Sequence, residues 1–117
     1  MRVSTPMEKE ITMGKKYRRY VAMGSGVSPD PNWAFEVQGS KVVTYKAEKS
    51  GFLGLKTTFV ATSETPLTPE LEVRVWDEDA KTGSGTCNLE SKGQTVDQYC
   101  VFGEVEEFAT TIRAALR

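Results

Sequence analysis

One amphipathic segment at the C-terminal end of the chain constrains the fold most strongly. Four apolar residues recur there at the spacing that lines one face of a helix: Val105, Phe108, Ile112 and Leu116. Glutamates gather at the start of the segment and arginines at its end, an arrangement that suits the helix dipole. The pattern predicts a helix over residues 104–116. Because such a helix buries its apolar stripe only against another element, we expect it to pack on a sheet.

The rest of the chain shows strand and turn patterns. Alternating side-chain types and an enrichment in β-branched and aromatic residues predict strands over residues 16–23, 33–38, 41–46, 55–62, 71–76, 86–90 and 96–102. Glycine, proline and acidic residues predict loops or turns over residues 24–31, 49–54, 63–69 and 77–79.

A length of 117 residues corresponds to one domain of ordinary size. Residues 1–14 are polar and show no sustained period, so we expect a flexible lead-in to a single strand-rich domain over residues 15–117. The expected fold class is mainly β (α+β). It would be an antiparallel β barrel or sandwich of about seven strands, with one C-terminal α-helix packed on it.

Two hairpins are predicted with a defined register. Gly39-Ser40 joins the second and third predicted strands, and glycine at the first position of a two-residue connection fits a type II′ turn. This register places Val37 opposite Val42. The last two strands form the other predicted hairpin, with Gly93-Gln94 as its turn.

The second register would place Cys87 directly opposite Cys100, in a pair whose side chains approach closely. The two cysteines are therefore a candidate cross-strand disulfide. The alternative is two reduced apolar side chains in the core, which the lack of a visible export signal favours. No general base adjoins either cysteine, so a catalytic thiol is not expected.

The composition excludes several kinds of chemistry. The chain contains no histidine, which removes Ser-His-Asp and Cys-His nucleophile arrangements and every histidine-containing metal site. Two cysteines alone do not complete a thiolate zinc site. Lys and Arg number 15 against 16 Asp and Glu, a balance that argues against a strongly basic nucleic-acid binder. We therefore expect a protein that is not an enzyme and that carries no cofactor or metal.

A basic and aromatic cluster in the first predicted strand is one candidate binding site. Its members are Lys15, Lys16, Tyr17, Arg18, Arg19 and Tyr20. Such a cluster would bind phosphate groups on lipid or nucleic acid. The alternative, more typical of a neutral protein, is a solvated edge strand whose charges discourage aggregation.

Phe52 and Leu53, which lie between two glycines in a predicted loop, are a second candidate. Apolar residues at a loop tip are uncommon unless they contact a partner or tuck back. They would either insert into a membrane surface or a protein groove, or fold over the mouth of the barrel as part of the core. The second alternative is the more ordinary one.

Two stretches are similar to pleckstrin-homology-like barrels. Residues 33–46 resemble the early aromatic hairpin of that fold, and residues 99–108 resemble its last strand running into an acidic helix start. Seven strands followed by one C-terminal helix is also its element order. The resemblance implies this architecture over residues 16–117. It does not imply binding of a lipid headgroup, because residues 24–34 lack the basic side chains that phosphoinositide binders place there.

The leading hypothesis is a non-catalytic binding or interaction module that recognises a protein or peptide partner, on an exposed sheet edge or in a groove beside the helix. One alternative is binding of single-stranded nucleic acid or an anionic ligand through the Lys15–Tyr20 strand. Another is a small-molecule carrier with a pocket between sheet and helix. No apolar run is long enough to span a membrane, and no signal peptide is visible, so a cytoplasmic location is expected.

Overall fold

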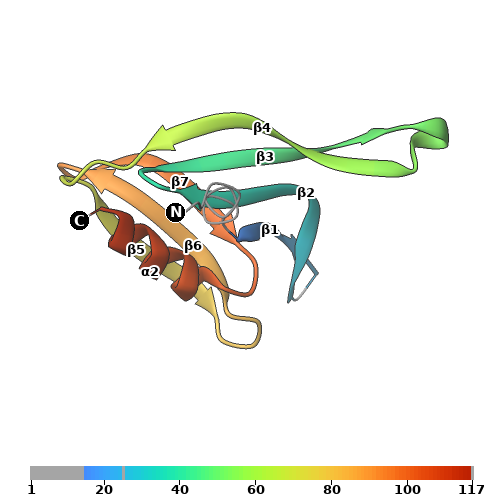
Figure 1. Ribbon diagram of the computed structural model, residues 1–117. Coiled ribbons are helices and arrows are strands. Elements are labelled where there is room, and N and C mark those ends of the chain that lie inside the picture. The colour runs from blue at the N-terminus through green and yellow to red at the C-terminus, as the bar shows by residue number, and fades with distance from the viewer. Residues whose placement is uncertain (1–14, 25, 117) are drawn as a thin grey trace, which may run out of the picture.

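The structure is a computed structural model, which describes residues 15–24 and 26–116 (Figure 1). The predicted lead-in, residues 1–14, lies outside this part. The elements follow in the order β1 (Lys16–Met23), β2 (Gly26–Gln38), β3 (Lys41–Ser50), the 3₁₀ turn η1 (Phe52–Gly54), β4 (Lys56–Pro66), β5 (Glu72–Asp79), β6 (Ser84–Ser91), β7 (Gln94–Val101) and α2 (Val105–Ala115).

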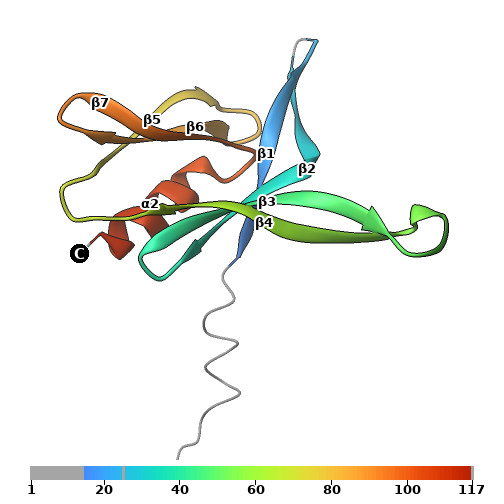
Figure 2. The same ribbon diagram turned by 90° about the horizontal axis from the view of Figure 1, so that it is seen from above.

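The strands form one antiparallel sheet in the order β4-β3-β2-β1-β7-β6-β5. Its two halves, β1–β4 and β5–β7, meet along a short seam, where Arg19 pairs with Val101. Figure 2 shows the halves splayed apart, with α2 lying between them. The expected mainly β class with about seven strands and one C-terminal helix is confirmed. The sheet stays open, so it does not close into a barrel.

The apolar stripe of α2 forms the centre of the core, as its spacing predicts. Phe108, fully buried, meets the rings of Tyr17 and Tyr99 edge-on, at centroid distances of 5.1 and 5.4 Å. Its ring also lies 6.1 Å from that of Phe35. Tyr17 belongs to β1, Phe35 to β2 and Tyr99 to β7, so one helical side chain contacts both halves of the sheet. The other wholly buried residues of the helix are Val105, Ala109 and Ile112.

The hairpin of β2 and β3 has the predicted register. Gln38 pairs with Lys41, and Val37 with Val42. Gly39 has a φ of 59°, whereas Ser40 keeps an ordinary negative φ. A positive φ at the first turn position alone is the backbone of a type II′ turn, which only glycine adopts easily.

Several predicted loops are wrong, because strands extend through them. β2 begins at Gly26, and residues 26–29 of the predicted 24–31 loop pair with β1. Its prolines are accommodated by a large irregularity, since the register jumps from Arg18 opposite Ala34 to Tyr20 opposite Pro29. Likewise β3 continues to Ser50 and β4 to Pro66.

The predicted register of the last hairpin is also wrong, so the pairing on which the candidate disulfide depended is absent from the structure. Its turn is Lys92-Gly93, where both residues have positive φ, and a bulge follows Leu89. Cys87 consequently pairs with Tyr99, while Cys100 pairs with Thr86. Neighbouring strand residues point to opposite faces, so the two thiols lie on opposite sides of the sheet. Both are free.

Phe108→Ala should lower the free energy of unfolding by about 3–5 kcal/mol, because it leaves a cavity between the two halves of the sheet. Thr110→Ala, on the exposed side of the same helix, is the matched control and should change it by less than about 0.5 kcal/mol. Urea denaturation followed by circular dichroism measures both. A loss below about 1 kcal/mol for Phe108→Ala would contradict the assigned core.

The thiols should react separately with Ellman's reagent. Cys100 is partly exposed and should react in the folded chain. Cys87 should react only on unfolding, because burial raises the pKa of its thiol to about 12 and leaves little thiolate. The folded Cys100→Ser variant should therefore show no rapid reaction. An unreduced, denatured wild-type chain with no reactive thiol would instead demonstrate a disulfide.

Candidate functional site

The basic cluster of β1 lies in the middle of the sheet, between β2 and β7, so the edge-strand interpretation is wrong. Tyr17 and Lys16 lie on opposite faces. Tyr17 is in the core, and its hydroxyl donates to Glu107 at 2.9 Å. Tyr20 shares a hydrogen bond with Thr86 at 3.2 Å. The cluster is therefore divided between the two faces and does not form one continuous patch.

Most cations of the cluster are paired with carboxylates. Lys15 binds both Glu104 and Glu107 at the start of α2. The hydrogen bond with Glu104, followed by the one with Glu107, raises the pKa of Lys15. Hydrogen bonds from Lys15 and Tyr17 lower the pKa of Glu107. Arg19 binds the buried Asp30 at 2.9 Å. This pairing reduces the positive charge available to an anionic ligand.

A second carboxylate, Glu36, is 1% exposed and accepts hydrogen bonds from Tyr45 at 2.7 Å and Gln38 at 3.0 Å. The ammonium group of Lys16 lies 3.6 Å from this carboxylate and 4.7 Å from the Tyr45 ring centroid. Burial, and then the bond to Glu36, raise the pKa of Tyr45 to about 12. Arg18 lies over the Phe59 ring and donates to the Asp30 carbonyl. The network fixes the base of the β3–β4 hairpin.

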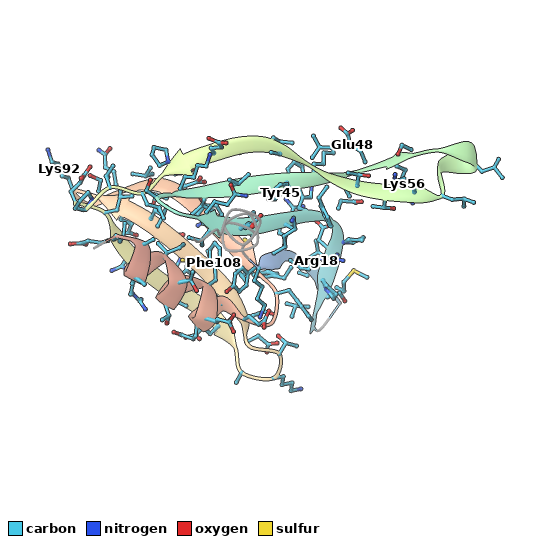
Figure 3. The ribbon with its side chains drawn as sticks, viewed as in Figure 1. Arg18, Tyr45, Glu48, Lys56, Lys92 and Phe108 are labelled. Atoms are coloured by element: carbon cyan, nitrogen blue, oxygen red, sulfur yellow. The ribbon has the colours of Figure 1, made fainter. Side chains whose placement is uncertain are left out.

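Beyond this base the hairpin projects from the body of the protein (Figures 1 and 2). β2 pairs with β3 as far as Lys46, and from Ala47 onwards β3 pairs only with β4. We call this two-stranded segment, residues 47–59, the arm. Figure 3 shows Glu48 and Lys56 on it, far from Phe108 in the core.

The tip of the arm carries the second predicted group. Leu53 is 75% exposed and has a φ of 62°, and Leu55 is 79% exposed. The interpretation in which Leu53 folds back over a barrel mouth is therefore wrong. The Phe52 side chain lies outside the described residues. Leu55 was not among the predicted binding residues.

The outer strand of the arm, β4, forms one edge of the sheet. All of its residues except Phe59 and Thr65 are exposed. A bulge in the pairing with β3 falls at Thr62, so the regular free edge covers residues 56–61. The predicted strand ended at residue 62. Its position at the edge of the sheet was not predicted, because the strand order depends on distant pairings.

A shallow depression of about 530 Å³ lies on the other half of the sheet, on the face away from α2. Its lining includes Asn88 and Trp76, whose side chains are 7% and 45% exposed respectively. The Asn88 Oδ1 atom is buried and has no hydrogen-bond partner among the described residues. Arg74 and Glu90, 3.9 Å apart, lie at the same site.

Two other depressions are open to solvent. One of about 430 Å³ includes Asp77, Glu78 and Asp79, and the pKa of Glu78 is raised by a hydrogen bond with Glu106. Another, of about 280 Å³, lies beside Trp33. Within residues 15–24 and 26–116, no group of three or more cysteine and acidic residues is arranged to hold a metal ion.

Comparison with protein-family models, curated proteins and solved structures found no match. The resemblance to pleckstrin-homology-like barrels therefore stays a prediction. Of the described helices, none combines the length and apolar character needed to cross a bilayer.

Tyr45→Phe should reduce the loss of stability in alkali. The folded chain holds the Tyr45 proton more tightly than the unfolded chain, whose tyrosines titrate near pH ~10. This contribution is complete below pH ~10 and is lost as the pH rises to about 12. Urea denaturation above and below pH ~10 should show a smaller decrease for Tyr45→Phe than for the wild type. Equal decreases would contradict the Tyr45–Glu36 hydrogen bond.

Proposed function

We propose that this chain is a non-catalytic interaction domain that binds a polypeptide partner as an added strand along the free β4 edge, residues 56–61, which begins in the arm and continues to its base. The observation that carries the proposal is the exposure of this edge strand over nearly all of its length. A sheet edge presents a row of unpaired backbone donors and acceptors, which an extended segment of another chain can satisfy.

The shape of the arm supports this function. A two-stranded ribbon is marginally stable in water, and residues 47–59 have only each other as sheet neighbours. A third strand would complete their hydrogen bonding and cover Val60, which is 39% exposed. The leucines at the tip would add apolar contact area beyond the end of the ladder.

Between Lys56 and the bulge at Thr62, the β4 edge has little of the usual protection of sheet edges. Charged side chains and proline blunt such edges in many proteins. Between Lys56 and Glu64 the strand contains neither. The opposite edge, β5, carries several acidic residues. The Arg113 guanidinium on α2 also donates a hydrogen bond to the Val73 carbonyl of this strand, at 3.4 Å. The β4 edge is therefore the better docking element for an uncharged extended segment.

Two features weigh against the other functions. The ion pairs of Lys15, Lys16 and Arg19 reduce the unpaired positive charge that the β1 cluster offers to nucleic acid. The Cys87 thiol is buried with a raised pKa, which disfavours its nucleophilic form at neutral pH.

Val60→Lys should abolish binding of extended peptides, because an added charge on an edge strand opposes strand addition. The test selects displayed random peptides on the full wild-type chain and measures the selected peptides by calorimetry against each variant. Val96→Lys, at a 51% exposed valine on β7, is the matched control and should bind like the wild type.

Peptides that bind Val60→Lys as tightly as the wild type would place the partner elsewhere on the molecule. Selection that yields no binding peptide would also contradict the proposal. Thermal unfolding of both variants checks that each is folded.

A further inference from the structure

We propose that the depression on the outer face of β5–β7 is a binding site for a neutral carbohydrate, a site separate from the β4 edge. The three groups that argue for it are the unpartnered amide oxygen of Asn88, the half-exposed indole of Trp76, and the oppositely charged pair Arg74 and Glu90. Each of them lines the depression.

Asn88 supplies the first argument. Asn88 is only 7% exposed, and its Oδ1 atom accepts no hydrogen bond within the described part of the chain. Buried polar atoms in proteins are nearly always satisfied by protein groups or ordered water, so an unsatisfied one in the lining of an open depression points to a donor from outside the chain. In the proposed complex this donor is a hydroxyl group of the ligand.

The register of the sheet places the other groups around this atom. Arg74 pairs directly with Asn88, and Glu72 with Glu90, so these side chains share the face that points away from α2. Trp76 lies two residues beyond Arg74 on the same face. Its indole offers a flat apolar surface beside a set of hydrogen-bonding groups.

The combination selects the class of ligand. Arg74 and Glu90 carry opposite charges, so the site has no net charge to attract a strong anion or cation. Arg74 donates hydrogen bonds, while Glu90 and the Asn88 oxygen accept them. A sugar ring presents hydroxyl groups that donate and accept around its rim, and apolar C–H groups on its faces. It therefore fits an indole surface bordered by donors and acceptors better than a phosphate or a carboxylic acid does.

The experiment uses the full chain carrying Trp33→Phe, which leaves Trp76 as its single tryptophan. Glucose, galactose, mannose and N-acetylglucosamine are titrated, each to well above about 1 mM, the weak end of specific affinity. At least one should shift the Trp76 emission with saturation. Inorganic phosphate and acetate at the same concentrations should not.

Asn88→Leu in the same background tests the amide oxygen. It should weaken the saturating sugar by about tenfold or more, because one hydrogen bond of the complex is lost. The variant should fold and unfold at the same denaturant concentration as its parent or higher, since it removes an unsatisfied buried group. Gln98→Leu, on the same sheet face but outside the depression, is the matched control and should bind like the parent.

Three outcomes would overturn the carbohydrate site. One is the absence of a saturating change with every sugar in the panel, and another is a saturating change with phosphate or acetate. The third is a marked destabilisation by Asn88→Leu, which would show that the amide oxygen is already satisfied within the folded chain. None of these outcomes bears on the β4 edge, because the peptide-binding measurement uses a different surface.

Discussion

The packing of Phe108 against Tyr17, Phe35 and Tyr99 is the interaction on which the rest of the architecture depends. The backbone joins the two halves of the sheet along only a short seam, and a sheet this open would expose its inner face to water. The helix covers that face, and its one aromatic side chain contacts three strands at once. Edge-to-face contacts stabilise the fold beyond the effect of the area that the rings bury. The rings therefore favour one specific packing geometry.

This central packing leaves both proposed binding surfaces outside the core. The core is concentrated where α2 meets the sheet, whereas the arm extends away from it and the Asn88 depression lies on the opposite face of β5–β7. Neither surface takes part in the aromatic cluster. Substitutions in the arm or the depression therefore leave the aromatic cluster intact, and the scaffold keeps the stability that α2 provides.

Local patterns in the sequence predicted the parts of the fold that depend on local interactions. The spacing of Phe108 and Ile112 defined the helix face, and Gly39-Ser40 defined a turn and a register. Strand order and bulges depend on distant partners, so the Cys87–Cys100 register and the 24–31 loop were wrong. The surroundings of the candidate site residues depend on distant partners in the same way. Nothing near Arg19 in the sequence marks Asp30 as its partner, and nothing near Asn88 marks its amide oxygen as unsatisfied.

The short seam between β1 and β7 also affects how the protein opens. It consists of the Arg19–Val101 pair and a hydrogen bond from the Phe102 N–H to the Arg18 carbonyl. Elsewhere the halves are joined by side-chain contacts, which include the aromatic cluster and the Tyr20–Thr86 hydrogen bond, rather than by a continuous backbone ladder. The other strand pairings lie within one half or the other, so we expect each half to keep its backbone hydrogen bonds when α2 detaches. The protein would then open in two units, β1–β4 and β5–β7, which α2 holds together in the folded state.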